Sequence, residues 1–315
     1  MKNTAIPNFF VVGAAKAGTT SLYYYLKQHP NIYLSPIKET HYFSTDIAVA
    51  EFSETYKKHT FLDLDSYFSE KPYKELALSF VQKKEHYKKL FEECKNEKAI
   101  GECSPSYLFS KEAPQNIYNH NPKAKIIISL RNPISRSFSH YLMALRIGQT
   151  SLSFKKAFEK DMASTNKGWG KTELFYELSM YSEQITRFVE LFPEEQIKFI
   201  LFEDLVKNTA TIIKECHQFL DIKPLDTLEI EKHNAASIPK YKKINHFFVK
   251  TGIKNASGKI LGEVRKEKIK KLVFDDKKIP KINEEDKAFL LELYKEDILK
   301  TQKIINKDLS AWLQN

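Results

Sequence analysis

The segment Gly13–Thr20, with the sequence GAAKAGTT, has the composition of a phosphate-binding loop. It follows a short apolar run and precedes a helical pattern, and the N–H groups at a helix N-terminus attract phosphate. The spacing of Gly13 and Gly18 matches a Walker A loop, but Thr19 stands where that motif has its lysine. Lys16, inside the loop, is the cation that the sequence offers instead. A glycine turn without a ligand is the alternative interpretation.

A second segment of this kind is Leu130–Tyr141, with the sequence LRNPISRSFSHY. A nucleoside triphosphatase needs an acidic metal ligand after a strand such as 124–130, and here the strand is followed by Arg131. Pro133 suits the first position of a helix because its missing N–H would have no partner there. A guanidinium and the hydroxyl of Ser139 together suit a terminal phosphate. The pattern favours phosphate binding by side chains, without metal, over kinase or ATPase chemistry; an ordinary ion pair of Arg131 is the alternative.

Apolar runs alternate with helical patterns along the chain. We expect strands at 8–12, 98–101, 124–130 and 197–202, a helix beginning at Thr19, and helices at 79–93, 134–145, 172–191, 209–220 and 283–312. This alternation predicts an α/β fold, a P-loop-like parallel sheet flanked by helices on both faces. The sequence has no repeat and no low-complexity linker, so we expect one domain over residues 1–315.

Two segments, 47–72 and 148–171, show no clear period and are predicted to be loops or insertions. Ligands of open α/β sheets bind outside the carboxyl ends of the strands. We therefore expect both segments to wall a substrate cleft and to carry the choice of substrate.

The composition, 42% hydrophobic and 13% aromatic in 315 residues, is that of an ordinary globular protein. Its longest apolar runs are far shorter than the roughly 20 residues of a membrane-spanning helix. Residues 1–7 have no apolar signal-peptide region, so we expect a cytoplasmic protein. Cys94, Cys103 and Cys216 are too scattered for a disulfide framework or a zinc site.

The net charge of +10 arises in one stretch, because residues 240–281 include fourteen basic and four acidic side chains. Such a stretch could face an anionic ligand, nucleic acid or an anionic membrane surface, or it could be an ordinary solvated surface. No nucleic-acid-binding signature accompanies it, so we expect no nucleic-acid partner. A polyanion-binding module is the least favoured hypothesis.

The two phosphate-binding segments together resemble the nucleotide-binding motifs of sulfotransferases that use 3′-phosphoadenosine 5′-phosphosulfate (PAPS). The matching stretches are KAGTTSL (16–22), KETHYF (38–43), ECSPSY (102–107), LRNPxxRxxSxY (130–141), 180–205 and 293–313, which span nearly the whole chain. The resemblance is nearest to the glycan-modifying branch, which includes the heparan sulfate enzymes, and to soluble bacterial relatives of it. It implies the sulfotransferase fold, PAPS as donor, no metal, and a hydroxyl or amine acceptor, with a carbohydrate expected.

The resemblance also assigns roles in binding the donor. Lys16 would stabilise the negative charge that builds on the bridging oxygen as the phosphate leaves. Arg131 and Ser139 would bind the 3′-phosphate, and Tyr181 and Lys240 would complete the nucleotide site. The 5′-phosphosulfate would be held by the first motif, through Lys16, Ala17, Gly18, Thr19, Thr20 and Ser21.

The acceptor must lose a proton, so a base is needed near the sulfuryl group. By resemblance Glu39 matches the catalytic glutamate of the glycan branch and His41 a histidine that supports it, while His41 is also the competing base. Without the resemblance, Glu39 beside Lys38 would be an ordinary surface ion pair. Cys103 replaces a lysine of the heparan sulfate 3-O-enzymes, which argues against heparan sulfate as the acceptor; we expect a buried structural thiol there.

The second hypothesis is a P-loop phosphotransferase that depends on Mg²⁺ and ATP. Thr19, in place of the Walker lysine, and Arg131, in place of an acidic residue, argue against it. The sequence predicts neither the acceptor, nor attack by oxygen or nitrogen, nor the oligomeric state.

Overall fold

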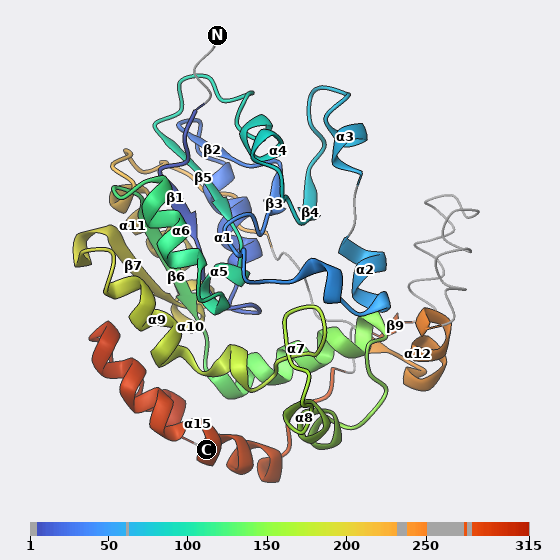
Figure 1. Cartoon of the computed structure of the whole chain (residues 1–315). Helices are drawn as coiled ribbons and strands as arrows, with labels where there is room; N and C mark the ends of the chain where they lie inside the picture. The colour runs from blue at the N-terminus through green and yellow to red at the C-terminus, as the bar shows by residue number, and fades with distance from the viewer. Residues whose placement is uncertain (1–4, 61–62, 232–237, 251–273, 276–278, 315) are drawn as a thin grey trace.

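The centre of the protein is a five-stranded sheet in which all neighbouring strands are parallel, in the order β2-β5-β1-β6-β7. The computed structural model describes residues 5–60, 63–231, 238–250, 274–275 and 279–314 (Figure 1). The strands are β1 (Phe9–Val11), β2 (Ile32–Leu34), β5 (Ala99–Cys103), β6 (Lys125–Leu130) and β7 (Ile197–Leu201). Their carboxyl ends all lie at one edge, and the predicted α/β class is confirmed.

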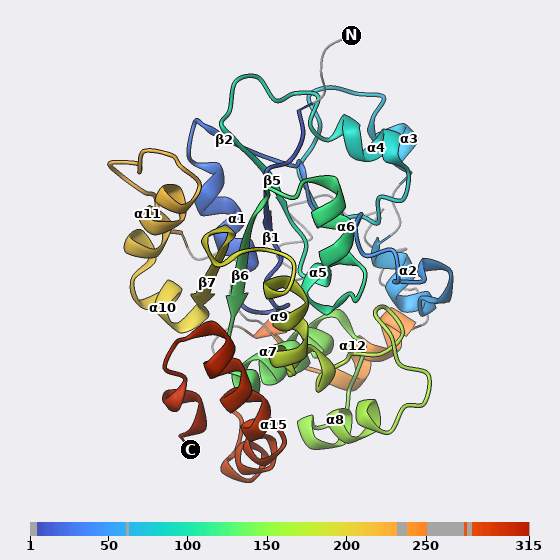
Figure 2. The ribbon, with the colours of Figure 1, turned by 60° about the vertical axis from the view of Figure 1, so that its left-hand side comes forward.

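Both faces of the sheet are covered, because the central strand alternates its side chains between two apolar clusters. Phe9 and Val11 belong to the cluster that includes side chains of α1 (Thr19–Lys27) and α11 (Thr209–Phe219). Phe10 belongs to the larger cluster on the opposite face. Figure 2 shows α1 and α11 on one side of the sheet and α6 on the other. The larger cluster includes side chains of α6 (Ala113–His120), α7 (Pro133–Ile147), α9 (Tyr181–Val189) and α15 (Glu284–Ile305).

The C-terminal helix α15 fixes the beginning of α9. Asp297 on α15 accepts hydrogen bonds from the backbone N–H groups of Tyr181 (2.6 Å) and Ser182 (3.1 Å), which have no partner within their own helix. The predicted helix over 283–312 is confirmed for most of its length, and a short 3-10 turn, η4 (Ser310–Leu313), follows it. Among the described helices none is both long and apolar enough to cross a bilayer.

Shorter elements complete the fold around this frame. A two-stranded parallel sheet pairs β3 with β4, and a two-stranded antiparallel sheet pairs β8 with β9. These elements are β3 (Ile37–Glu39), η1 (Val49–Glu51), α2 (Glu54–Thr60), α3 (Leu64–Tyr67), β4 (Leu76–Leu78), α4 (Lys84–Lys89), α5 (Ser106–Phe109), α8 (Phe154–Met162), η2 (Glu177–Ser179), η3 (Glu194–Gln196), α10 (Phe202–Lys207), β8 (Ile238–Pro239), α12 (Lys242–Lys250) and β9 (Phe274–Asp275).

Two predicted helices are wrong over part of their length. Within 79–93 only α4 is helical, because the N–H groups of Ser79 and Val81 bond instead to carbonyls at the end of β3 and just beyond it. Within 172–191 the helix begins only at α9. There the carboxylate of Asp161 accepts three backbone N–H bonds from residues 173–175 and holds them in a loop.

The two segments predicted to be loops contain short helices. Residues 47–72 include η1, α2 and α3, and residues 148–171 include α8. In α8 the buried side chains Phe154, Ala157 and Phe158 do follow helical spacing, which the prediction overlooked. The strands β2, β3 and β4 were also missed, because three residues are too few to show a period. Most of the basic stretch 240–281 lies outside the described residues, so its role stays a prediction.

Gly13 lies two residues beyond the end of β1, where the chain runs close to β6. A Cβ atom at this position would lie 2.5 Å from the backbone nitrogen of Ser129 and 2.6 Å from its carbonyl oxygen. The next residue, Ala14, donates its N–H to that same carbonyl oxygen (2.8 Å). A side chain here would therefore push the following loop away from the sheet.

We predict that Gly13→Ala lowers the free energy of unfolding by about 1–3 kcal/mol, since rigid backbone atoms occupy the space that the methyl group needs. Gly168→Ala is the matched control, because its Cβ would meet only the flexible side chain of Lys171, at 3.2 Å. Thermal unfolding of both variants measures the effect. Equal unfolding temperatures would contradict this account of the contact with β6.

Candidate active site

The loop between β1 and α1 is fastened to the end of β6. Ser129 donates its hydroxyl to the carbonyl oxygen of Ala17 (2.5 Å), and Arg131 donates from Nη1 to the carbonyl oxygen of Lys16 (3.1 Å). Lys16 and Gly18 both have positive φ, 72° and 84°. A Cβ at Gly18 would lie 2.8 Å from the Phe202 ring, so the loop folds tightly onto α10. Gly18 is the N-cap of α1, and the free N–H groups of the first helical turn follow directly.

Four cations converge on this loop. Burial lowers the pKa of Lys16 to about 8, with further lowering by Arg146 on α7, by Arg131 and by Lys38, while Glu39 raises it. The Lys16 ammonium contacts the sulfur of Met143 at 3.5 Å. Like charges held together in a partly buried site repel one another, and a bound anion would relieve that repulsion.

Arg131 follows β6 and its guanidinium lies over the ring of Phe202, 4.4 Å from the ring centroid. Its Nε atom is buried and has no hydrogen-bond partner among the described residues. Burial also lowers its pKa, which the neighbouring Glu203 partly offsets. Ser139 is partly exposed on α7, two turns from the strand end. The arrangement leaves donor groups of Arg131 available for an anionic ligand.

The buried hydroxyl of Tyr181 donates to the carbonyl oxygen of Arg131 (2.8 Å). The structure therefore gives Tyr181 a part in positioning the end of β6, and its predicted contact with a nucleotide stays a prediction. Lys240 is exposed directly after β8, and β8 packs against α7. The predicted contact of Lys240 with a nucleotide also stays a prediction.

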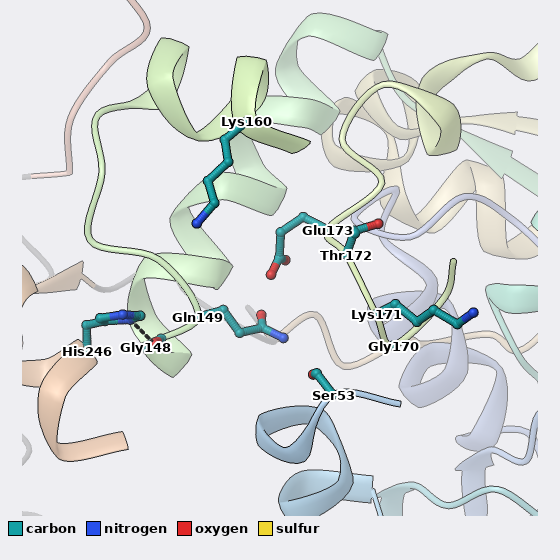
Figure 3. A pocket seen from close by; sticks show the side chains of 9 residues that line it. All are labelled: Ser53, Gly148, Gln149, Lys160, Gly170, Lys171, Thr172, Glu173 and His246. Carbon is teal, nitrogen blue, oxygen red and sulfur yellow. Dashed lines mark hydrogen bonds between the residues drawn. The ribbon is translucent and has the colours of Figure 1, made fainter. Parts of the chain in front are cut away.

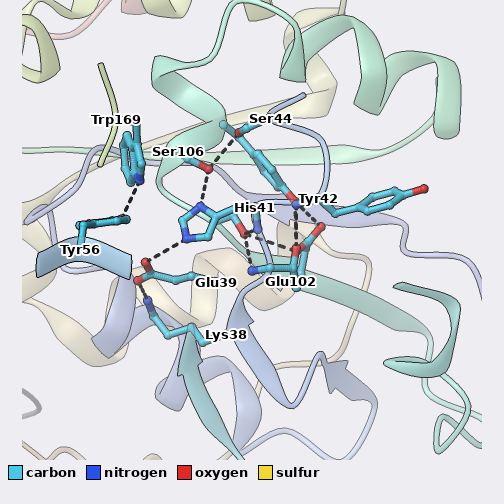
Figure 4. Close-up of polar contacts among 12 residues, drawn as sticks. Lys38, Glu39, His41, Tyr42, Ser44, Tyr56, Glu102, Ser106 and Trp169 are labelled. Atoms are coloured by element: carbon cyan, nitrogen blue, oxygen red, sulfur yellow. Dashed lines mark hydrogen bonds and ion pairs between the residues drawn. The ribbon is translucent and has the colours of Figure 1, made fainter. Parts of the chain in front are cut away.

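The predicted carboxylate and histidine lie together, with Lys38 beside them (Figure 4). Glu39 ends β3 and forms an ion pair with Lys38, while its second oxygen lies 3.9 Å from Nε2 of His41. Burial alone would lower the pKa of Lys38, but the contact with Glu39 outweighs it and the pKa is raised. Because Glu39 also acts on the pKa of Lys16, the loop and this carboxylate face one site.

His41 is held rigidly, with φ of 54°. Its Nδ1 is hydrogen-bonded to the hydroxyl of Ser106 (2.7 Å), and its ring stacks on Phe80 with centroids 4.1 Å apart. The ring of Trp169 lies 5.8 Å away. Burial lowers the pKa of His41 to about 4, so the imidazole is neutral near pH 7. Its Nε2, which faces Glu39, has no hydrogen-bond partner in the described part of the chain.

Beneath this pair lies Glu102, which is fully buried. Tyr87 and Tyr107 each donate a hydroxyl to it at 2.8 Å, and the hydroxyl of Thr40 also donates to it. Burial nevertheless raises the pKa of Glu102 to about 7. Because Thr40 lies between the two candidate bases in sequence, this network fixes the backbone that carries both.

The comparisons with known proteins agree with this geometry. The model of the family described as "Sulfotransferase family" matches residues 7–226. The chain belongs to the sulfotransferase family. A solved structure of a sulfotransferase from Alicyclobacillus acidocaldarius superposes with a TM-score of 0.69 at 28% identity, over 98% of this chain and 100% of that one.

Two curated sulfotransferases illustrate the more distant relatives. The membrane-associated sulfotransferase kil1 of Dictyostelium discoideum is 24% identical over 311 residues, covering 74% of this chain and 60% of its own length. The mouse (Mus musculus) heparan sulfate glucosamine 3-O-sulfotransferase 5 is 24% identical over 224 residues, covering 70% of this chain and 54% of its own. This sulfotransferase chain spans about half the length of the curated relatives it matches.

The structure adds residues to the candidate site of this sulfotransferase that the sequence analysis did not select. Arg146 and Met143 both act on Lys16, and they follow His140 along α7 at intervals of three residues. Spacing of that kind was the signal that could have found them. The three cysteines are free, and Cys103 is buried with its pKa raised to about 12, as expected of a structural thiol. Within the described residues no group of three or more His, Cys, Asp or Glu side chains is placed to hold a metal ion.

We predict that His41 makes stability depend on pH in the acid range. Its pKa is lower in the folded protein than in the unfolded chain, so its contribution is present above about pH 6.5 and is lost as the pH falls through about 4. The stability of the parent, relative to His41→Gln, should fall by on the order of 2–3 kcal/mol over that range. Denaturant unfolding at several pH values measures this difference. Parallel curves for the two proteins would contradict the burial of a neutral imidazole.

Proposed function

We propose that the protein transfers a sulfuryl group from PAPS to a hydroxyl or amine group of a carbohydrate acceptor. The observation that carries the proposal is the convergence of Lys16, with its lowered pKa, and the pair of Glu39 and His41 on one site at the carboxyl edge of the sheet. Lys16 would stabilise an anionic leaving group, and the pair of Glu39 and His41 would accept a proton. Sulfuryl transfer requires both.

The donor would lie along the β1–α1 loop. The N–H groups of residues 17–21, at the beginning of α1, would bind the 5′-phosphosulfate. Arg131 and Ser139 would bind the 3′-phosphate, with the unpartnered Nε of Arg131 as one donor. Tyr181 would contribute by fixing the strand end, and Lys240 would approach from β8. No metal is assigned a role.

The acceptor oxygen or nitrogen would attack sulfur while the bond from sulfur to the bridging phosphate oxygen breaks. Adenosine 3′,5′-bisphosphate leaves with the electron pair of that bond, and the Lys16 ammonium stabilises its new charge. The proton of the acceptor passes to Glu39. His41, neutral at pH 7 and locked by Ser106, would orient that carboxylate.

A carbohydrate acceptor is supported by the named activities of relatives such as carbohydrate sulfotransferase 15, also from Mus musculus, which is 23% identical over 257 residues, covering 70% of this chain and 44% of its own. Formation of adenosine 3′,5′-bisphosphate from PAPS with a panel of glycans, together with a gain of one sulfate group by mass spectrometry, tests the proposal. A phosphotransferase is less well supported, because Arg131 follows β6 where an acidic metal ligand would be needed. Reaction in the cytoplasm stays a prediction.

We predict that Lys16→Ala lowers kcat by two or more orders of magnitude, because a cation at the leaving oxygen acts mainly in the transition state. Lys27→Ala is the control, since Lys27 ends α1, the helix that follows the loop of Lys16, and pairs with Glu75 at the surface. Steady-state kinetics of nucleotide release compares them. An unchanged kcat in Lys16→Ala would remove this lysine from the mechanism.

The base is assigned by a second pair of variants. Glu39→Gln keeps the shape of the side chain and removes its basicity, so we expect kcat to fall by about 10²–10⁴-fold. His41→Ala should lower kcat less, because it removes only the group that orients the carboxylate. Single-turnover transfer separates the chemical step from product release. If Glu39→Gln reacts at the parental rate and His41→Ala does not, His41 is the base.

A further inference from the structure

A polar pocket of about 290 Å³ lies beyond the C-terminal end of α7 (Figure 3). Figure 3 shows the side chains of Ser53, Gln149, Lys160 and Glu173 turned toward a common hollow, whereas Lys171 turns away and pairs with Glu51. The volume is at the lower end of the range of about 300–1,000 Å³ that is usual for ligand sites. The pocket suits one sugar unit better than a long chain.

The pocket is connected to the candidate active site by α7. His140 lies 3.6 Å from Glu173 through its Nε2, and Lys16 is one of the charges that lower the pKa of His140, after burial and Arg136. One turn further along the helix, Met143 contacts the Lys16 ammonium. Gln149, just past the end of α7, lines the pocket. The same helix therefore borders the proposed sulfuryl site and this hollow.

A second connection runs through Trp169. Its ring lies 5.8 Å from the His41 ring, and its Nε1 donates to the hydroxyl of Tyr56 (2.8 Å). After burial, Glu39 and then Glu173 are the charges that raise the pKa of Tyr56. Gly170, which directly follows Trp169 in the sequence, lines the pocket. The pocket therefore lies next to a residue whose ring packs near His41.

Among the described residues that line the pocket, Glu173 is the one with a carboxyl group, and it is held firmly. Asp161 accepts the N–H bonds of residues 173–175 and fixes the loop. The amide of Gln149, with its nitrogen toward Glu173, lies 3.3 Å from both carboxyl oxygens. Burial and the nearby Asp161 raise the pKa of Glu173 to about 8, so at pH 7 it is largely a neutral acid that both donates and accepts hydrogen bonds. Hydroxyl groups offer the same two capacities.

We infer that this pocket is the acceptor subsite and that Glu173 selects a hydroxyl-bearing sugar unit by hydrogen-bonding one of its hydroxyl groups. Gln149 and Ser53 present further polar atoms to the same unit. Lys160 also turns toward the hollow, so the proposed recognition is of the hydroxyl group and does not exclude a carboxylate elsewhere on the unit. The inference rests on the proposed sulfuryl transfer and adds the class of acceptor.

The probes are the p-nitrophenyl β-glycosides of glucose, galactose and N-acetylglucosamine, compared with the β-glucuronide. Saturation-transfer NMR measures their binding in the presence of adenosine 3′,5′-bisphosphate, and transfer from PAPS measures turnover. We expect at least one of these four glycosides to bind and to be sulfated. No binding by any of the four glycosides overturns the inference.

Glu173→Ala should raise KM for the reacting glycoside about 10-fold or more and change kcat less. Glu159→Gln, at an exposed position of α8, is the control. Deoxy analogues of the glycoside, each lacking one hydroxyl group, identify the hydroxyl that Glu173 binds. With the parent enzyme, one analogue should show a kcat/KM at least 10-fold below that of the full glycoside. With Glu173→Ala, the same analogue and the full glycoside should have nearly equal kcat/KM. If removing a hydroxyl group lowers kcat/KM by the same factor in the parent and in Glu173→Ala for every analogue, the inference is contradicted. Binding of adenosine 3′,5′-bisphosphate is measured in the parent and in each variant. If the parent does not bind it, the proposed function itself fails.

Discussion

The repulsion among Lys16, Arg131, Arg146 and Lys38 is the constraint around which the site is organised. Glu39 is paired directly with Lys38 and also acts on Lys16, while Glu203 is the carboxylate that acts on Arg131. Burying several like charges is unfavourable unless an anion joins them. A ligand with two well-separated phosphate-type groups would neutralise both ends of the cluster, the loop after β1 and the end of β6. The donor proposed for this chain has that charge distribution.

The fold holds the loop of Lys16 and the end of β6 together through backbone contacts, whereas Lys38 is held by its ion pair with Glu39. Gly13 allows β1 to approach β6, and Ser129 and Arg131 hold the following loop by its carbonyl oxygens. Asp297 on α15 fixes α9, from which Tyr181 reaches the carbonyl of Arg131. The end of β6 is thereby fixed from two sides. A site built in this way has its cations in place before an anion arrives, which lowers the cost of ordering them on binding.

The parallel sheet and the phosphate-binding loop were predictable because β1, β6 and the first turn of α1 carry strong local signals, apolar runs followed by Gly13 and Pro133. The β3–β4 pair was not, because its three-residue strands depend on pairing with each other. Glu39 therefore had no structural context in the sequence and was selected through resemblance. Arg146 could have been found from its helical spacing to Met143 on α7, whereas Glu173 lies in a loop held by Asp161, a contact that no local pattern in the sequence reveals.

The most direct test of the account is calorimetric titration with adenosine 3′,5′-bisphosphate at pH 8, in two buffers of different ionisation enthalpy, compared with AMP and with Mg²⁺-ATP. Because the pKa of Lys16 is about 8, an anion that raises it should cause uptake of about half a proton. We predict that the bisphosphate binds most tightly, with this uptake, and that Lys16→Ala abolishes the uptake. Tighter binding of Mg²⁺-ATP, or bisphosphate binding no stronger than that of AMP, would contradict the assignment of this cluster to a PAPS site.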